Sequence, residues 1–184
     1  MPWKNGGGRT TEIAVHPPGA GLDAFDWRVS VADVEADGPF SPFPGIDRTI
    51  VLLDGAGMRL ACGERAVDLR VRYEPFVFSG DVSMTCTLLS GPVRDFNLML
   101  RRGRVRGTVA ALRDGTARIA ASAERLCFVA AGAFECVLPG GLPFTLAEGQ
   151  TLRVGGDADD ALATLAMTPV SPAAVALVVN IDPC

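Results

Sequence analysis

Short apolar stretches separated by glycine and proline dominate this chain, and they constrain its fold more than any other feature. The 184 residues include 21 glycines and 13 prolines, and the stretches between them are rich in Val, Leu, Phe and Thr. Brief runs of this kind, bounded by turn residues, are typical of strands rather than of amphipathic helices. In the first half, strands are predicted at residues 12–15, 27–34, 49–53, 58–62, 69–73, 76–78, 85–89 and 93–100.

The second half has the same character. Its predicted strands cover residues 125–130, 134–138, 144–146, 151–154, 162–167 and 175–181. Only the alanine-rich region 108–123 could hold a helix, and its apolar pattern is poor. The chain is therefore predicted to be all-β.

An internal sequence repeat relates the two halves. Residues 49–60 read TIVLLDGAGMRL and residues 126–138 read LCFVAAGAFECVL, in each case a strand, a glycine turn and a second strand. These β-hairpin units recur at a separation of about 75 residues. They predict two small antiparallel jelly-roll barrels, over residues 1–105 and 106–184, because closing the sheets protects their edges. A single β-sandwich without duplication is the alternative.

Charge and composition argue against several classes of function. The net charge of −4 and the sequence pI of about 5.0 disfavour a nucleic-acid surface, which needs basic residues. The start, MPWKNGGGRT, lacks the apolar segment of a secretory signal, and no apolar run approaches the ~20 residues of a membrane-spanning helix. The five cysteines form no CxxC pair, and four lie in apolar runs, so a cytoplasmic, reducing location is expected.

The histidine content argues against metal chemistry. A histidine-ligated site needs several imidazoles and a carboxylate that converge on one ion. His16 is the chain's single histidine, it precedes Pro17 in a predicted turn, and no HxH or HxxxE pattern occurs. A GxSxG nucleophile motif is also missing. The prediction is that the protein uses neither a metal nor another cofactor.

Polar and apolar residues alternate in the predicted strand 93–100. Phe96 and Leu98 share one face, and Asp95 and Asn97 share the other. If the apolar face packs between sheets, Asp95 and Asn97 look into a barrel lumen, where buried polar groups need hydrogen bonds or a ligand. The alternative is a solvent-facing strand with ordinary surface residues.

Two arginines could face the same lumen. Arg28 and Ser30 share a face of strand 27–34, and Arg48 leads into strand 49–53. A guanidinium matches the geometry of a carboxylate and can hold it through two parallel hydrogen bonds. The alternative for Arg28 is a surface salt bridge, which would stabilise the fold little.

The run of three glycines after Lys4 and Asn5 permits a tight bend that would present these two side chains. Neither GxxxxGK[ST] nor a helix-opening GxGxxG is present, so nucleotide binding is weakly supported, and a flexible N-terminal turn is the alternative. Residues 37–48, DGPFSPFPGIDR, are predicted to form a long ordered loop. Its prolines and phenylalanines favour a rim packed on the barrel mouth.

At these residues the sequence resembles the HutD/Ves family, which is associated with histidine utilisation or stress response in bacteria. The matching stretches are PWKNGGGRTTEIA, FDWRVSVADVEADGPFSPFPGIDRTIVLLDGAGMRL, PFVFSGD and GPVRDFNLMLRR, in the family's order within the first 102 residues. The resemblance implies a double cupin (bicupin), a homodimer, and a pocket for a small carboxylate such as urocanate or formylglutamate. By match to the family's motifs, the residues that would line or support the pocket are Lys4, Asn5, Arg28, Ser30, Arg48, Asp95 and Asn97.

The leading functional prediction is a regulatory protein that senses an anionic intermediate of histidine breakdown. Its partner would be a small metabolite, with no nucleic acid or membrane involved. The alternative is a metal-independent cupin enzyme, an isomerase or hydrolase acting on a small carboxylate. In that enzyme Asp95 or Lys4 would transfer protons, with Glu12 as the candidate partner of Asp95. A third reading is a scaffold whose dimer surface matters more than its pocket.

Overall fold

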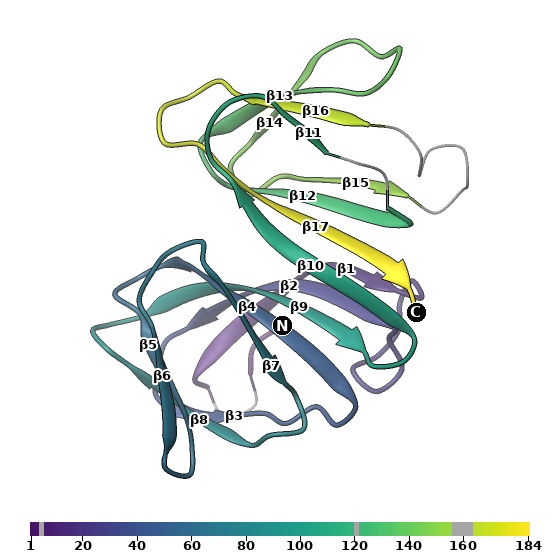
Figure 1. The fold of residues 1–184 in the computed structure, drawn as a ribbon. Helices are drawn as coiled ribbons and strands as arrows, with labels where there is room; N and C mark the ends of the chain where they lie inside the picture. Colours follow the sequence, from purple (N-terminus) through teal and green to yellow (C-terminus); the bar gives the residue numbers. More distant parts are fainter. Residues whose placement is uncertain (4–5, 120–121, 156–163) are drawn as a thin grey trace. The chain divides into compact units, whose positions relative to one another are not determined.

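The computed structural model describes residues 1–3, 6–119, 122–155 and 164–184, and these residues form β-strands and turns without a helix. The all-β prediction is confirmed. The chain divides into two compact units, Met1–Val105 and Arg106–Cys184 (Figure 1). No helix in the described part of the chain has the length and apolar character needed to cross a membrane.

The first unit consists of two antiparallel sheets. The five-stranded sheet has the order β1 (Gly8–His16), β2 (Trp27–Val34), β9 (Val93–Arg101), β4 (Ile46–Asp54) and β7 (Pro75–Ser79). The four-stranded sheet has the order β3 (Gly38–Phe40), β8 (Met84–Leu88), β5 (Met58–Cys62) and β6 (Arg65–Leu69). A core cluster joins side chains of both sheets, among them Ile50, Met58 and Cys86. The apolar residues of alternate strand positions therefore meet inside the unit, as in a jelly roll.

The second unit repeats this plan with a mostly apolar interior, in which Arg125 is also buried. One sheet has the order β10 (Val105–Leu112), β17 (Val175–Pro183), β12 (Glu124–Ala131) and β15 (Thr151–Gly155). The other has the order β11 (Ala117–Ile119), β16 (Leu165–Pro169), β13 (Ala133–Val137) and β14 (Phe144–Ala147). Its buried core cluster consists of apolar residues and cysteines, including Phe134, Cys136 and Met167.

In both copies of the internal repeat the glycine turn is a corner that leads from one sheet to the other. The prediction of a β-hairpin at each turn is therefore wrong. β4 pairs with β7 and β9, whereas β5 pairs with β6 and β8 in the facing sheet. Gly57 makes the crossing with a φ of 112°, and a Cβ there would lie 2.3 Å from the Leu69 carbonyl oxygen. In the second unit Gly132, with a φ of 68°, joins β12 to β13 in the same way. A corner buries both strands against one core, which a flat hairpin cannot do.

Two further expectations from the sequence are corrected, and the open question of a helix is decided for the described residues. Of the region 108–123, residues 108–112 belong to β10 and 117–119 form β11, and alternate residues of β10 are exposed, which is the period of a strand. The strand expected at 69–73 is β6 instead, because the turn after Cys62 sets its pairing with β5 and the chain bends after Leu69. The loop 37–48 contains β3 and the start of β4. Residues 162–163 of the strand expected at 162–167 lie outside the described residues.

The glycine run folds the N-terminus back onto β1. Gly6 has a φ of 69°, the Trp3 amide donates to the Gly8 carbonyl oxygen at 2.9 Å, and Pro2 bridges Arg9. A Cβ at Gly8 would lie 2.3 Å from the Asp33 carbonyl oxygen and 3.2 Å from the Trp3 ring. Only glycine fits where the returning segment, β1 and the end of β2 converge.

The crowding at Gly8 predicts a stability effect. We expect Gly8→Ala to lower the free energy of unfolding by about 1–3 kcal/mol, because the added methyl group meets backbone that must shift. Denaturant unfolding measures the change. Thr11→Ala, at an exposed position of the same strand, is the control and is expected to change stability much less. Equal midpoints for Gly8→Ala and the unmodified protein would contradict the prediction.

Candidate functional site

The register of three central strands arranges the inward-facing residues of the five-stranded sheet in rows. β2, β9 and β4 pair antiparallel, so each inward residue of β9 has one neighbour from β2 and one from β4. The rows are Arg28–Met99–Arg48, Ser30–Asn97–Ile50 and Ala32–Asp95–Leu52. The polar groups of three strands are thereby concentrated on one patch of an otherwise apolar lumen.

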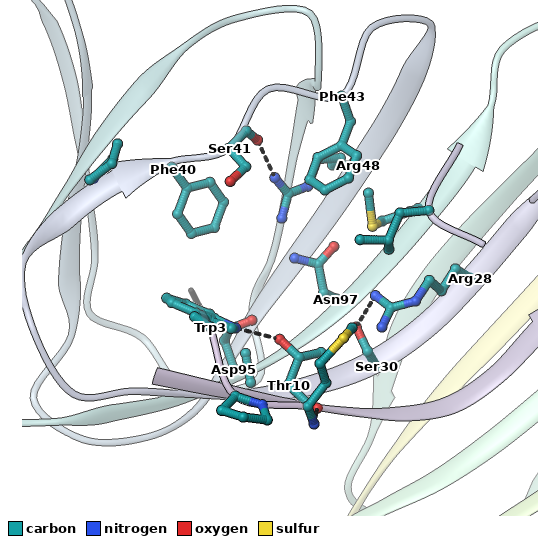
Figure 2. Close-up of a pocket in the computed structure, with 16 residues that line it drawn as sticks. Trp3, Thr10, Arg28, Ser30, Phe40, Ser41, Phe43, Arg48, Asp95 and Asn97 are labelled. Atoms are coloured by element: carbon teal, nitrogen blue, oxygen red, sulfur yellow. Dashed lines mark hydrogen bonds between the residues drawn. The ribbon is translucent and has the colours of Figure 1, made fainter. Parts of the chain in front are cut away.

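A cavity of about 450 Å³ opens over this patch. This volume lies within the range of small-molecule sites in proteins. Five of the seven residues predicted from the sequence line it together: Arg28, Ser30, Arg48, Asp95 and Asn97. The other two, Lys4 and Asn5, lie outside the described residues. Figure 2 shows the labelled side chains gathered around the cavity.

Arg48 is buried in an aromatic cage. Its guanidinium carbon lies 4.6 Å from the ring centre of Phe40, 5.3 Å from that of Phe43 and 5.1 Å from that of Phe78. Burial lowers the pKa of Arg48 to about 10, and although Asp95 opposes this shift, the group stays cationic at neutral pH. The rings interact favourably with the cation and also restrict its position, leaving a fixed positive charge at the cavity wall.

Arg48 Nη1 also donates to the Ser41 carbonyl oxygen at 3.4 Å (Figure 2), whereas Arg28 is held by polar side chains. Its Nε donates to Glu12 Oε2 at 2.8 Å, and its Nη1 donates to Ser30 Oγ at 3.2 Å. The Arg28 side chain is 6% exposed whereas Glu12 is 45% exposed, so the pair links the cavity to solvent. Glu12, considered above as a partner of Asp95, thus pairs with Arg28 and neutralises its charge.

Asp95 and Asn97 bring buried acceptors into the cavity. Asp95 is 1% exposed and Asn97 is 6% exposed. Neither carboxyl oxygen of Asp95, nor the amide oxygen of Asn97, has a hydrogen-bond partner among the described residues. Burial raises the pKa of Asp95 to about 7, an effect that Arg48 only partly offsets and Asp33 reinforces. Buried polar atoms are normally paired, so unpaired ones directed at a cavity indicate a site built for a ligand.

Aromatic residues that sequence reasoning did not assign to the site complete its wall. Trp3 lines the cavity, and its indole Nε1 donates to Thr10 Oγ1 at 2.7 Å. Phe40 and Phe43, assigned from the sequence only to a rim, line it as well (Figure 2). Trp3 precedes the glycine run, and Phe40 and Phe43 lie in the proline-rich segment 37–48. Aromatic residues next to turn-forming glycines and prolines were the sequence signal that could have placed them at the site.

The loop that carries Phe43 is fixed by an ion-pair network. The Phe43 amide donates to the Gly80 carbonyl oxygen at 2.7 Å, and the Gly45 amide donates to Asp81 Oδ1 at 2.6 Å. Arg102 bridges Asp81 at 2.8 Å and Asp47 at 2.7 Å. The Gly45 amide, followed by Ser79 and Arg102, lowers the pKa of Asp81 to about 2, so this anchor keeps its charge across the physiological range.

The remaining candidate groups lie outside this arrangement. His16 ends β1 and stacks on Trp27 with ring centres 5.9 Å apart.

Cys62, expected in the core, is exposed, whereas Cys86, Cys127 and Cys136 are buried. Burial raises the thiol pKa of Cys86 and of Cys136 to about 11 and that of Cys127 to about 12. Within the described ranges no three His, Cys, Asp or Glu side chains form a group that could hold a metal ion.

The raised pKa of Asp95 predicts a pH-dependent stability. The folded protein keeps this proton up to about pH 7, whereas the unfolded chain releases it near its ordinary pKa of 3.8. The contribution of Asp95 to stability therefore falls as pH rises from about 4 to about 7, and stays constant above that. In Asp95→Asn this decline should disappear, with a difference of a few kcal/mol in relative stability between pH 4 and pH 8.

Denaturant unfolding across this pH range measures the effect. Asp54→Asn is the control, because Asp54 is an exposed carboxylate that pairs with Arg72 outside the cavity. Identical pH profiles for the unmodified protein and Asp95→Asn would contradict the assignment.

Comparison with known proteins identifies relatives over most of the chain. The family model described as HutD matches residues 1–170. A Pseudomonas putida protein described as an uncharacterized 21.2 kDa protein in the hutC 3' region is 44% identical over 131 residues, 71% of this chain and 68% of that protein. Protein Ves of Citrobacter koseri is 38% identical over 134 residues, 72% of this chain and 69% of that protein. The family is linked to the histidine-utilisation locus.

Solved structures agree with this relationship. A conserved protein of unknown function from Pseudomonas aeruginosa PAO1 has a TM-score of 0.89 at 38% identity, covering 99% of this chain and 93% of its own. HutD from Pseudomonas fluorescens SBW25 has a TM-score of 0.82 at 35% identity, covering 100% and 93%. A cupin 2 barrel protein from Leptotrichia buccalis, with a TM-score of 0.62 at 9% identity over 95% and 89%, shares the fold alone. The double-cupin prediction is confirmed, and the chain belongs to the HutD family.

Proposed function

We propose that the protein binds a small carboxylate metabolite in the cavity of its first unit and regulates histidine utilisation through that binding. Urocanate and formylglutamate are the candidate ligands. The regulatory role rests on the family's link to the histidine-utilisation locus. The partner in this proposal is a small anionic metabolite, and the homodimer implied by the resemblance stays a prediction.

The observation that carries the proposal is the state of Arg48. Its guanidinium is buried among phenylalanine rings, and its Nε has no hydrogen-bond partner among the described residues. A buried cation is costly unless an anion compensates it, and a guanidinium is well matched to a carboxylate. The rings supply packing and some electrostatic attraction but no acceptor, and the Ser41 carbonyl oxygen accepts only a long hydrogen bond, 3.4 Å, from Arg48 Nη1.

Charge balance favours a ligand with a single carboxylate at this end of the cavity. Glu12 already compensates Arg28. Asp95 does not hydrogen-bond to Arg48, and its pKa of about 7 leaves it partly neutral at physiological pH. Asp95 therefore compensates the charge of Arg48 only in part, and both guanidinium groups can still donate hydrogen bonds to a carboxylate ligand.

A metal-independent enzyme is the second candidate, and the pKa of Asp95 favours it. A carboxyl group with a pKa of about 7 is suited to general acid or base catalysis near neutral pH. Product analysis after incubation with urocanate or formylglutamate decides between the two: turnover that is lost in Asp95→Asn supports an enzyme. Unchanged ligand recovered from a complex that binds it supports a binding protein.

The proposal predicts a loss of affinity in Arg48→Met, which removes the charge and keeps a long side chain. We expect the dissociation constants for urocanate and formylglutamate to rise about 10- to 100-fold, because charged hydrogen bonds are lost. Isothermal titration calorimetry measures them.

The matched control is Arg70→Met, since Arg70 is an exposed arginine paired with Asp68 outside the cavity. Its affinities are expected to equal those of the unmodified protein. No heat at millimolar ligand, or an unchanged dissociation constant in Arg48→Met, would refute carboxylate binding at this site.

A further inference from the structure

The cavity has two chemically different ends. Arg28 and Arg48 share a row with Met99, whereas Asp95 lies two inward-facing positions away along β9, with Asn97 between them. Figure 2 shows Asn97 between the Arg48 guanidinium and Asp95. We call Asp95 and Asn97 the acceptor pair.

The unpaired atoms at the two ends also differ. Among the described residues, the unpaired buried atoms of this cavity are one donor, Arg48 Nε, and three acceptors, Asp95 Oδ1, Asp95 Oδ2 and Asn97 Oδ1. A carboxylate offers acceptors only, so it can satisfy the arginines but leaves the ionised Asp95 carboxylate and Asn97 Oδ1 without a donor. A ligand that matches the whole cavity must also bring a hydrogen-bond donor.

Several neighbouring donors of the wall are already engaged. The Trp3 indole N–H donates to Thr10 Oγ1, Arg28 Nε donates to Glu12, and Arg28 Nη1 donates to Ser30. Asp95 keeps an oxygen that can accept a hydrogen bond whether the carboxyl is ionised or neutral. A hydrogen-bond donor of the ligand therefore finds an acceptor at this pair whether Asp95 is ionised or neutral.

We infer that Asp95 and Asn97 determine specificity by selecting carboxylates that carry an N–H donor at the end remote from the carboxylate. This inference rests on the proposed carboxylate-binding function and names the class of ligand. It also separates the roles within the site, because the arginines hold the charge that all carboxylates share. The acceptor pair recognises the group that distinguishes one carboxylate from another, since an unmet buried acceptor penalises analogues that lack the donor.

The test uses two carboxylates of similar shape. Urocanate has an imidazole ring with an N–H group, and 3-(2-furyl)acrylate has a furan ring that cannot donate. At pH 8 an imidazole with a pKa of about 6.5 is mostly neutral, so the comparison isolates the N–H group from a positive charge. Calorimetry of the full chain should give a dissociation constant at least about tenfold lower for urocanate.

Substitutions then assign the preference to residues. Asp95→Ala is expected to reduce the preference for urocanate to nearly one while changing the affinity for 3-(2-furyl)acrylate little. Asp95→Asn keeps an acceptor oxygen and should retain most of the preference. Asn97→Ala is an independent variant that should reduce it in part, and thermal unfolding verifies that each variant is folded.

The outcomes separate this inference from the proposed function. Equal affinities for both probes in the unmodified protein overturn the inference and leave carboxylate binding intact. A preference that persists in both Asp95→Ala and Asn97→Ala overturns the assignment to the acceptor pair. Binding of neither these two probes nor formylglutamate overturns the proposed function, and the inference with it.

Discussion

The antiparallel pairing of β2, β9 and β4 determines the position of each polar group in the cavity. These strands are buried along almost their whole length, so a one-residue slip would turn Arg28, Asp95 and Arg48 toward the opposite, apolar environment. The apolar residues of the alternate positions, such as Phe96 and Leu98, are fully buried and oppose such a slip. A single hydrophobic pattern therefore fixes the register and places the site.

Burying the polar groups of the site lowers the free energy of unfolding, and other interactions of the first unit must offset this loss. Removing Arg48 and Asp95 from water costs several kcal/mol each, and a desolvated cation–π contact contributes about 2 kcal/mol or more. The aromatic cage therefore offsets part of the cost for Arg48 and none of the cost for Asp95. Groups kept buried at such expense are common at functional sites, where binding rather than folding repays the desolvation.

The second unit shows what the same plan becomes with far fewer buried polar groups. Its core cluster is filled by apolar residues and cysteines, such as Val129 and Phe134, and its one buried charged residue in the described ranges is Arg125, whereas the first unit buries two arginines, an aspartate and an asparagine. The repeat of the fold is thus not a repeat of the chemistry. Residues that line a lumen by strand parity are a functional signal only when they are polar and unpaired.

Much of this protein could be predicted from the order of its residues. Turn spacing and short apolar runs indicated an all-β double barrel, and the alternation in 93–100 placed Asp95 and Asn97 on one face, because side chains along a strand alternate strictly. The same argument brought Arg28 and Ser30 together. These predictions depend on local periodicity, which the sequence carries directly.

Tertiary structure alone decided the rest. Whether a glycine turn makes a hairpin or a corner depends on which distant strand pairs with the next segment, and this separated β4 from β5. The cage around Arg48 joins phenylalanines from β3, a loop and β7, and no sequence spacing relates them. The sequence by itself determined which residues are inward and polar. Only the folded chain determined which of them meet, because contacts between strands depend on long-range pairing and the local period does not encode it.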